Sequence, residues 1–74
     1  MNVIGKIYFA DGHTEEILKH VDILGASVFV TQSEVYVYKG EYYRYESLSE
    51  HFVSCNDIVK TELEDEEDAF RVGG

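Results

Sequence analysis

The chain of 74 residues carries 15 Asp and Glu residues against 6 Lys and Arg residues, which gives a net charge of −9. This balance argues against direct binding of DNA, RNA or an anionic membrane, because such ligands need a basic surface. It favours a basic protein as the partner. The length fits one small domain, and the lone cysteine, Cys55, excludes an internal disulfide framework.

The N-terminal residues contain no Lys- or Arg-led apolar segment, and no apolar run in the sequence is long enough to cross a bilayer. We therefore expect neither a signal peptide nor a membrane span, and a location in a reducing cytoplasm. The charge distribution divides the sequence into two parts. Residues 1–63 form a domain that we expect to be β-rich, and residues 64–74 form an acidic tail that opens with a run of five acids.

The first predicted strand covers residues 3–9 and ends at the turn signal Asp11-Gly12. Two interpretations remain open for residues 14–24. A hairpin would pair Lys6 with Glu16 and Ile4 with Leu18, whereas an amphipathic helix would begin at Thr14 and end before Gly25. We favour the hairpin because the Asp-Gly turn follows directly from a good strand.

Residues 27–31 predict another strand, and residues 35–45 predict a hairpin that turns at Lys39-Gly40. A two- or four-residue loop would place Tyr36 opposite Tyr43 and gather four tyrosines on one face. A three-residue loop would shift the register by one and divide them between the two faces. We favour the first register, which gives one surface formed by Tyr36, Tyr38, Tyr43 and Tyr45.

The Ser-x-x-Glu pattern at Ser47 to Glu50 predicts one short helical turn, and residues 58–63 predict a closing strand. Together these elements predict a mainly β fold, with α+β as the alternative. We expect a single small antiparallel sheet of about five or six strands, accompanied by at most one short helix.

The sequence contains no arrangement of residues that is typical of catalysis, and we expect neither an enzyme nor a bound cofactor. His51 and Cys55 are four residues apart and would share a face only on a helix. Two ligands are too few for a structural zinc site, so we expect no metal site.

The ending Asp68-Ala69-Phe70-Arg71-Val72-Gly73-Gly74 resembles that of ubiquitin-like modifiers and sulfur-carrier proteins. That resemblance implies a β-grasp fold, which contains a long helix after the first hairpin, and a function that depends on the terminal Gly73-Gly74. The rest of the sequence departs from this order, because a helix at residues 14–24 would replace the second strand.

In length, acidity, β-rich pattern and acidic C-terminal end, the chain resembles short acidic proteins of bacteriophages and mobile elements, among them anti-CRISPR and anti-restriction inhibitors that imitate nucleic acid. The resemblance implies a basic nucleic-acid-binding partner, such as a CRISPR effector, in the cytoplasm of a bacterial host. The residues that would replace phosphates are Glu62, Glu64, Asp65, Glu66, Glu67 and Asp68, with Glu34, Glu41 and Glu46 as additions. The four tyrosines of the predicted surface would act as aromatic anchors.

A second hypothesis is a non-enzymatic β-rich interaction module or a homo-oligomer, in which the tyrosine surface is the self-contact and the acids serve solubility.

Overall fold

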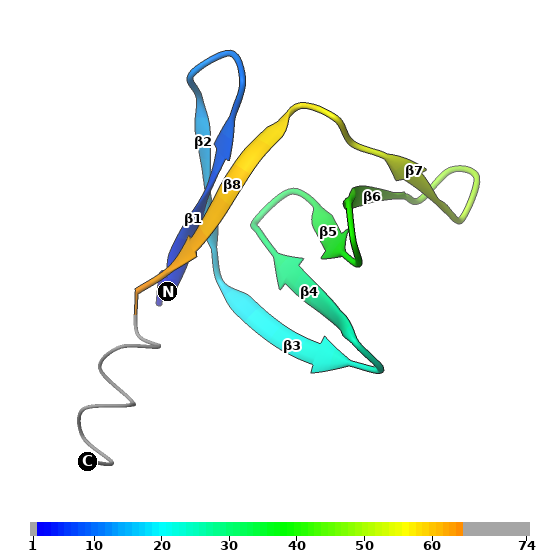
Figure 1. Cartoon of the computed structure of the whole chain (residues 1–74), viewed down its shortest axis with the longest axis horizontal. Coiled ribbons are helices and arrows are strands. Elements are labelled where there is room, and N and C mark those ends of the chain that lie inside the picture. The colour runs from blue at the N-terminus through cyan, green and yellow to red at the C-terminus, as the bar shows by residue number, and fades with distance from the viewer. Residues whose placement is uncertain (1, 65–74) are drawn as a thin grey trace.

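The computed structural model describes residues 2–64. These residues form eight strands in two antiparallel sheets and contain no helix (Figure 1). The mainly β, antiparallel prediction is therefore confirmed, although the chain builds two sheets and not one. The predicted tail lies outside the described residues except for Glu64.

The smaller sheet has the order β2-β1-β8. Its strands are β1 (Gly5–Phe9), β2 (Thr14–Ile17) and β8 (Ile58–Leu63). Lys6 lies opposite Glu16 in the β1–β2 hairpin, as the hairpin interpretation predicted. On its other side β1 pairs with β8, which places Lys6 opposite Glu62 as well.

The larger sheet has the order β3-β4-β5-β6-β7, so each strand pairs with its neighbour in the sequence. The strands are β3 (Lys19–Ile23), β4 (Ala26–Val30), β5 (Val35–Tyr38), β6 (Tyr42–Glu46) and β7 (His51–Ser54). This up-and-down order is the meander expected from closely spaced short strands joined by turns.

One residue, Leu18, connects the two sheets between β2 and β3. Its N–H group donates to the carbonyl of Val30 at 2.8 Å, so the chain leaves the first sheet and joins the second within a single residue. Figure 1 shows β2 running into β3, and β8 returning from β7 to lie beside β1.

The core lies between the inner faces of the two sheets. Its buried hydrophobic side chains are Ile7, Phe9, Ile17, Phe29, Tyr36 and Ile58. The alternation of buried and partly exposed residues along β1 follows the two-residue period of a strand. The rings of Phe9 and Tyr36 meet edge to face at a centroid distance of 5.9 Å and join the two sheets.

Gly5 allows β1 to approach β8 closely. A Cβ atom at this position would overlap the backbone carbonyl oxygen of Glu62. Because that neighbour is backbone and not a flexible side chain, the contact cannot be relieved by a rotamer change.

The predicted register of the tyrosine hairpin is wrong. Residues 39–41 form a three-residue loop in which Gly40 has a φ of +77°, and Tyr38 lies opposite Tyr42. The left-handed glycine in a three-residue loop is typical of a bulged hairpin connection. Tyr36 and Tyr38 therefore share one face with Tyr42, while Tyr43 lies on the opposite face with Val37.

The helical predictions are also wrong for the described residues. Residues 14–23 form β2 and β3, which belong to different sheets. The residues from Ser47 to Glu50 form a turn that leads into β7, and Glu50 adopts a φ of +59°, outside the helical region. The long helix of the β-grasp fold is absent from residues 2–64. The ubiquitin-like hypothesis therefore rests only on the terminal Gly73-Gly74, which lies outside the described residues.

Candidate binding site

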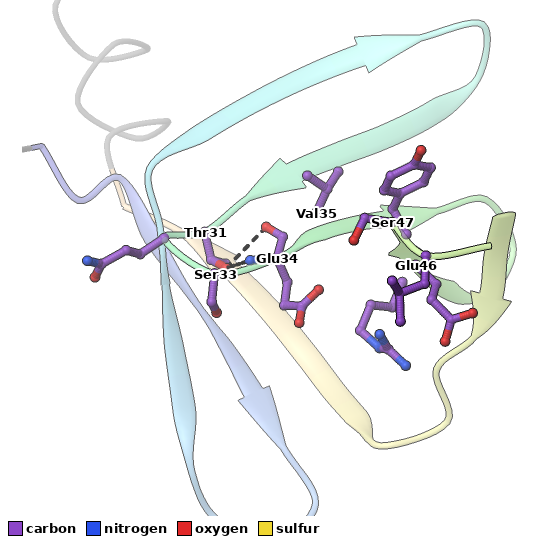
Figure 2. Close-up of a pocket in the computed structure, with 10 residues that line it drawn as sticks. Thr31, Ser33, Glu34, Val35, Glu46 and Ser47 are labelled. Atoms are coloured by element: carbon purple, nitrogen blue, oxygen red, sulfur yellow. Dashed lines mark hydrogen bonds between the residues drawn. The ribbon is translucent and has the colours of Figure 1, made fainter. Parts of the chain in front are cut away.

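An open groove lies at the end of the larger sheet where β5 begins and β6 ends (Figure 2). It is lined by the loop before β5 and by the end of β6 with the turn that follows, and its volume is about 520 Å³. The groove brings together three of the predicted site residues, namely Glu34, Tyr45 and Glu46.

Local hydrogen bonds hold the loop that carries Glu34 and the turn that follows Glu46 at the end of β6. The N–H group of Glu34 donates to Oγ1 of Thr31 at 3.0 Å (Figure 2). On the facing turn, the hydroxyl of Ser49 donates to Oε1 of Glu46 at 2.7 Å. The N–H group of Glu50 also donates to the carbonyl of Glu46, at 2.8 Å. Each carboxylate is therefore presented by a hydrogen-bonded turn.

The groove contains more acid than base, since Arg44 is the single basic residue that lines it. Within residues 2–64, neither Arg44 nor Glu34 nor Glu46 has an ion-pair partner within 4.0 Å. Leu48, which is 96% exposed, lines the groove as well. Two carboxylates without an ion pair beside an apolar side chain suit the basic side chains of a protein partner.

Tyr36, one of the predicted anchors, is a core residue that is only 2% exposed. Its hydroxyl donates to Oε2 of Glu15 at 3.1 Å, and the hydroxyl of Thr31 donates to Oε1 of the same carboxylate at 3.0 Å. Burial, followed by the negative charge of Glu15, raises the pKa of Tyr36 above its ordinary value. These hydrogen bonds connect the smaller sheet to the larger one, so Tyr36 stabilises the fold and does not form a surface.

The other three predicted anchors lie on two different faces. Tyr38 is 41% exposed and its ring lies 4.6 Å from that of Tyr42. Tyr43 and Tyr45 lie on the opposite face, where the ring of Tyr45 meets that of Phe52 edge to face at 5.2 Å. The single tyrosine surface predicted from the sequence is therefore not formed.

Glu62, a predicted phosphate mimic, already has partners within the chain. It accepts hydrogen bonds from the hydroxyl of Tyr8 at 2.8 Å and from Nζ of Lys60 at 3.2 Å. The hydrogen bond from Tyr8 is the largest cause, and the bond from Lys60 the next, of a pKa for Glu62 that is below its ordinary value. This carboxylate is less available to a partner than those of the groove.

The remaining predicted acids lie away from the groove or outside the described residues. Glu41 is exposed in the turn between β5 and β6, at the other end of these strands, and Glu64 is exposed at the end of the described chain. The acids beyond the described residues are Asp65, Glu66, Glu67 and Asp68.

The larger sheet also has an apolar surface that the sequence analysis missed, which we call the outer face. It is the face opposite the core, and strand pairing assigns twelve residues to it. These residues are Lys19, Val21, Ile23, Ala26, Val28, Val30, Val35, Val37, Tyr43, Tyr45, Phe52 and Ser54. A signal was present in the uninterrupted apolar run from Val28 to Val30, because a strand without polar alternation is apolar on both faces.

Among the described residues, no group of three or more His, Cys, Asp and Glu side chains is placed to hold a metal ion. His51 is the first residue of the extended strand β7 and Cys55 directly follows its last residue, so the two do not share one face of a helix. The described part of the chain also contains no helix with the length and apolarity needed to span a membrane.

Comparisons of the chain with protein-family models, with curated proteins and with solved structures found no match.

Proposed function

We propose that this chain is a non-enzymatic acidic inhibitor, which binds a basic nucleic-acid-binding enzyme of a bacterial defence system, such as a CRISPR effector, and blocks its nucleic-acid channel. The observation that carries the proposal is the groove at the end of the larger sheet. There, Glu34 in the loop before β5 and Glu46 at the end of β6 present carboxylates that have no ion pair within residues 2–64.

Carboxylates can take the place of phosphates because both groups are anionic acceptors that pair with Lys and Arg. A net charge of −9 accelerates association with a basic channel and makes the association sensitive to salt. Tyr45 and Leu48 line the same groove, and an aromatic and an apolar contact would supply the part of the affinity that salt does not screen. The acids of the tail would add to the long-range attraction.

A competition experiment tests this proposal. The full chain is immobilised and exposed to the heparin-binding proteins of a bacterial lysate, and the retained proteins are challenged with duplex DNA. We expect a nucleic-acid-binding enzyme to be retained, to be released by the DNA and to lose its nucleic-acid-dependent activity when the soluble chain is added. If DNA releases none of the retained proteins, the proposed mimicry is wrong.

Charge-matched variants locate the contact. The double variant Glu34→Gln, Glu46→Gln removes two acids from the groove, and Glu41→Gln with Asp57→Asn removes two exposed acids elsewhere. Both variants have the same net charge. We expect the groove variant to weaken binding at least tenfold more than the control. Equal losses would mean that only the overall charge matters and that the groove is not the site.

A further inference from the structure

The outer face of the larger sheet is apolar in spite of the acidity of the chain. None of its twelve residues is Asp or Glu, and its single charge is the cation of Lys19. Three of its apolar side chains have substantial exposure, namely Val21 at 36%, Ile23 at 51% and Phe52 at 53%. When one face of a sheet is exposed to solvent, that face normally carries polar residues. The outer face lacks most of them, so it has the composition of the centre of a protein interface.

The distribution of charge favours a second copy of the chain as the partner that covers the outer face. Two copies that each carry a charge of −9 repel one another wherever acids face acids. The outer face is a surface on which no acid of one copy would oppose an acid of the other. A basic partner, in contrast, would gain its electrostatic attraction at the acidic surfaces and not here.

The shape of the outer face is self-complementary. At the β3 edge, Val21 and Ile23 project from the sheet. Toward the β7 edge lies an apolar hollow of about 260 Å³, lined by Val37, Tyr43 and Phe52 with the stem of Lys39. An isologous dimer requires one surface to supply both the projection and the hollow that receives it.

Strand register places the projection and the hollow at the same level of the sheet. Val21 pairs with Val28, Val28 with Val37, and Val37 with Tyr43, so a single row crosses four strands. A two-fold axis parallel to the strands would turn the β3 edge of one copy over the β7 edge of the other. This rotation leaves the position of the row along the strand direction unchanged. It therefore brings Val21 of each copy to the hollow of its partner.

We propose that two copies of this chain associate through their outer faces as an isologous dimer. The two sheets stack about 10 Å apart with their strands roughly aligned, as in a β-sandwich. Five strands about 4.8 Å apart and about 17 Å long give a footprint of roughly 400 Å² per copy. This is about half of a standard interface, so the dimer is weak and its population depends on concentration. The inference does not use the acids of the groove, although Val35 and Tyr45 belong to both surfaces.

Sedimentation equilibrium of the full chain over a wide concentration range tests the proposal. We expect the mass to rise from that of a monomer to that of a dimer. Phe52→Glu should raise the dissociation constant at least tenfold, because it places an acid in the contact. Val59→Glu is the matched control, since Val59 is an exposed apolar residue of the smaller sheet, at 62% exposure. Circular dichroism verifies that both variants fold.

Two outcomes would overturn the proposal. One is a monomer at every concentration, which would leave the outer face to a different protein. The other is an equal effect of Phe52→Glu and Val59→Glu, which would place the self-contact elsewhere.

A cross-linking measurement does not depend on introducing a charge. Because β5 is the middle strand of the larger sheet, the two-fold axis brings the β5 strands of the two copies together. Sheets about 10 Å apart are too far apart for a direct disulfide between facing residues, so a short bifunctional thiol reagent is used. We expect this reagent to join two copies of Val37→Cys, whereas the wild-type chain, which has only Cys55, is joined much more slowly. Equal rates for the two chains would contradict the proposed geometry.

Discussion

The outer faces of the two sheets differ in chemistry although both are built by the same strand alternation. On the smaller sheet, Glu16, Lys6 and Glu62 form a row of alternating charge across three strands. In the next row Lys60 lies over the ring of Tyr8, 5.0 Å from its centroid. On the larger sheet the corresponding rows are mainly aliphatic and aromatic, and Lys19 is their one charged residue.

This difference indicates which surface is adapted to water. Cross-strand pairs of opposite charge stabilise a sheet while keeping its face hydrated, and the register of the smaller sheet places Lys6 opposite both Glu16 and Glu62. The larger sheet has no such pair on its outer face. We infer that the outer face of the smaller sheet is exposed to solvent, whereas the outer face of the larger sheet is adapted to contact with another surface.

The strongest test of the comparison is a truncation in the core. Ile7 is fully buried between the sheets. We expect Ile7→Ala to lower the free energy of unfolding by about 2–5 kcal/mol, because it removes buried apolar surface and leaves a cavity. Urea denaturation at low protein concentration measures the change. Val37→Ala on the outer face should cost the monomer clearly less, and equal losses would contradict the assignment of the core face.

The next largest effect is expected at the close contact between β1 and β8. Gly5→Ala should lower the free energy of unfolding by about 1–3 kcal/mol, because the added methyl group meets the backbone carbonyl of Glu62. Urea denaturation is again the measurement. Gly12→Ala is a comparison of a different kind, since Gly12 has a φ of +98°, at which a Cβ is strained, but no atom within 4 Å of the added Cβ. Its loss of stability reports backbone strain without overlap, whereas the loss in Gly5→Ala reports overlap at a position without a positive φ. Stability equal to that of wild type for Gly5→Ala would show that the two strands separate readily.

A smaller effect is expected at the hydrogen bonds that join the two sheets. Tyr36→Phe removes the hydroxyl that donates to Glu15, and we expect a loss of about 1 kcal/mol at neutral pH. Tyr38→Phe is the control, because the side chain of Tyr38 is 41% exposed.

The same residue should also affect the stability at alkaline pH. The raised pKa of Tyr36 means that its neutral form stabilises the folded state at pH values below the ordinary tyrosine pKa of 10.0. Above that value the folded chain binds more protons than the unfolded chain, so the free energy of unfolding falls as the pH rises toward the folded pKa. We expect this part of the alkaline decline to disappear in Tyr36→Phe. An unchanged slope would show that Tyr36 titrates normally.

The smallest effect is expected at the tip of the β3–β4 hairpin. Leu24 is 94% exposed and adopts a φ of +50°, a conformation that residues other than Gly, Asn and Asp rarely adopt. Leu24→Asn should therefore raise the free energy of unfolding by about 0.5–1 kcal/mol. Thermal unfolding at low concentration measures the gain, and a lower melting temperature would mean that Leu24 stabilises the fold by contacts within the chain.

Much of the fold could be predicted because strand periodicity and turn residues are local signals. The β1–β2 turn at Asp11-Gly12, the pairing of Lys6 with Glu16 and the closing strand were recognised in this way. The single-residue crossing at Leu18 could not be predicted, since residues 14–23 carry no Gly or Pro to mark the change of sheet.

The site was harder to predict because its geometry depends on register. A three-residue loop around Gly40, in place of a two- or four-residue loop, puts Tyr36 on the core face and Tyr43 on the outer face, and the sequence allowed all three loop lengths. Glu34, Tyr45 and Glu46 were identified as separate candidates, but only the pairing of β5 with β6 places the loop before β5 beside the end of β6 and brings them into one groove.

The topology also predicts an order of folding. Strands β3 to β7 pair only with neighbours in the sequence, whereas β1 and β8 lie near the two ends of the described chain. Bringing distant segments together costs more loop entropy than forming successive hairpins. We expect the hairpins of the larger sheet to form first and β8 to join β1 last. During that interval the outer face is already assembled, so a nascent chain could meet a second copy before its own core is closed.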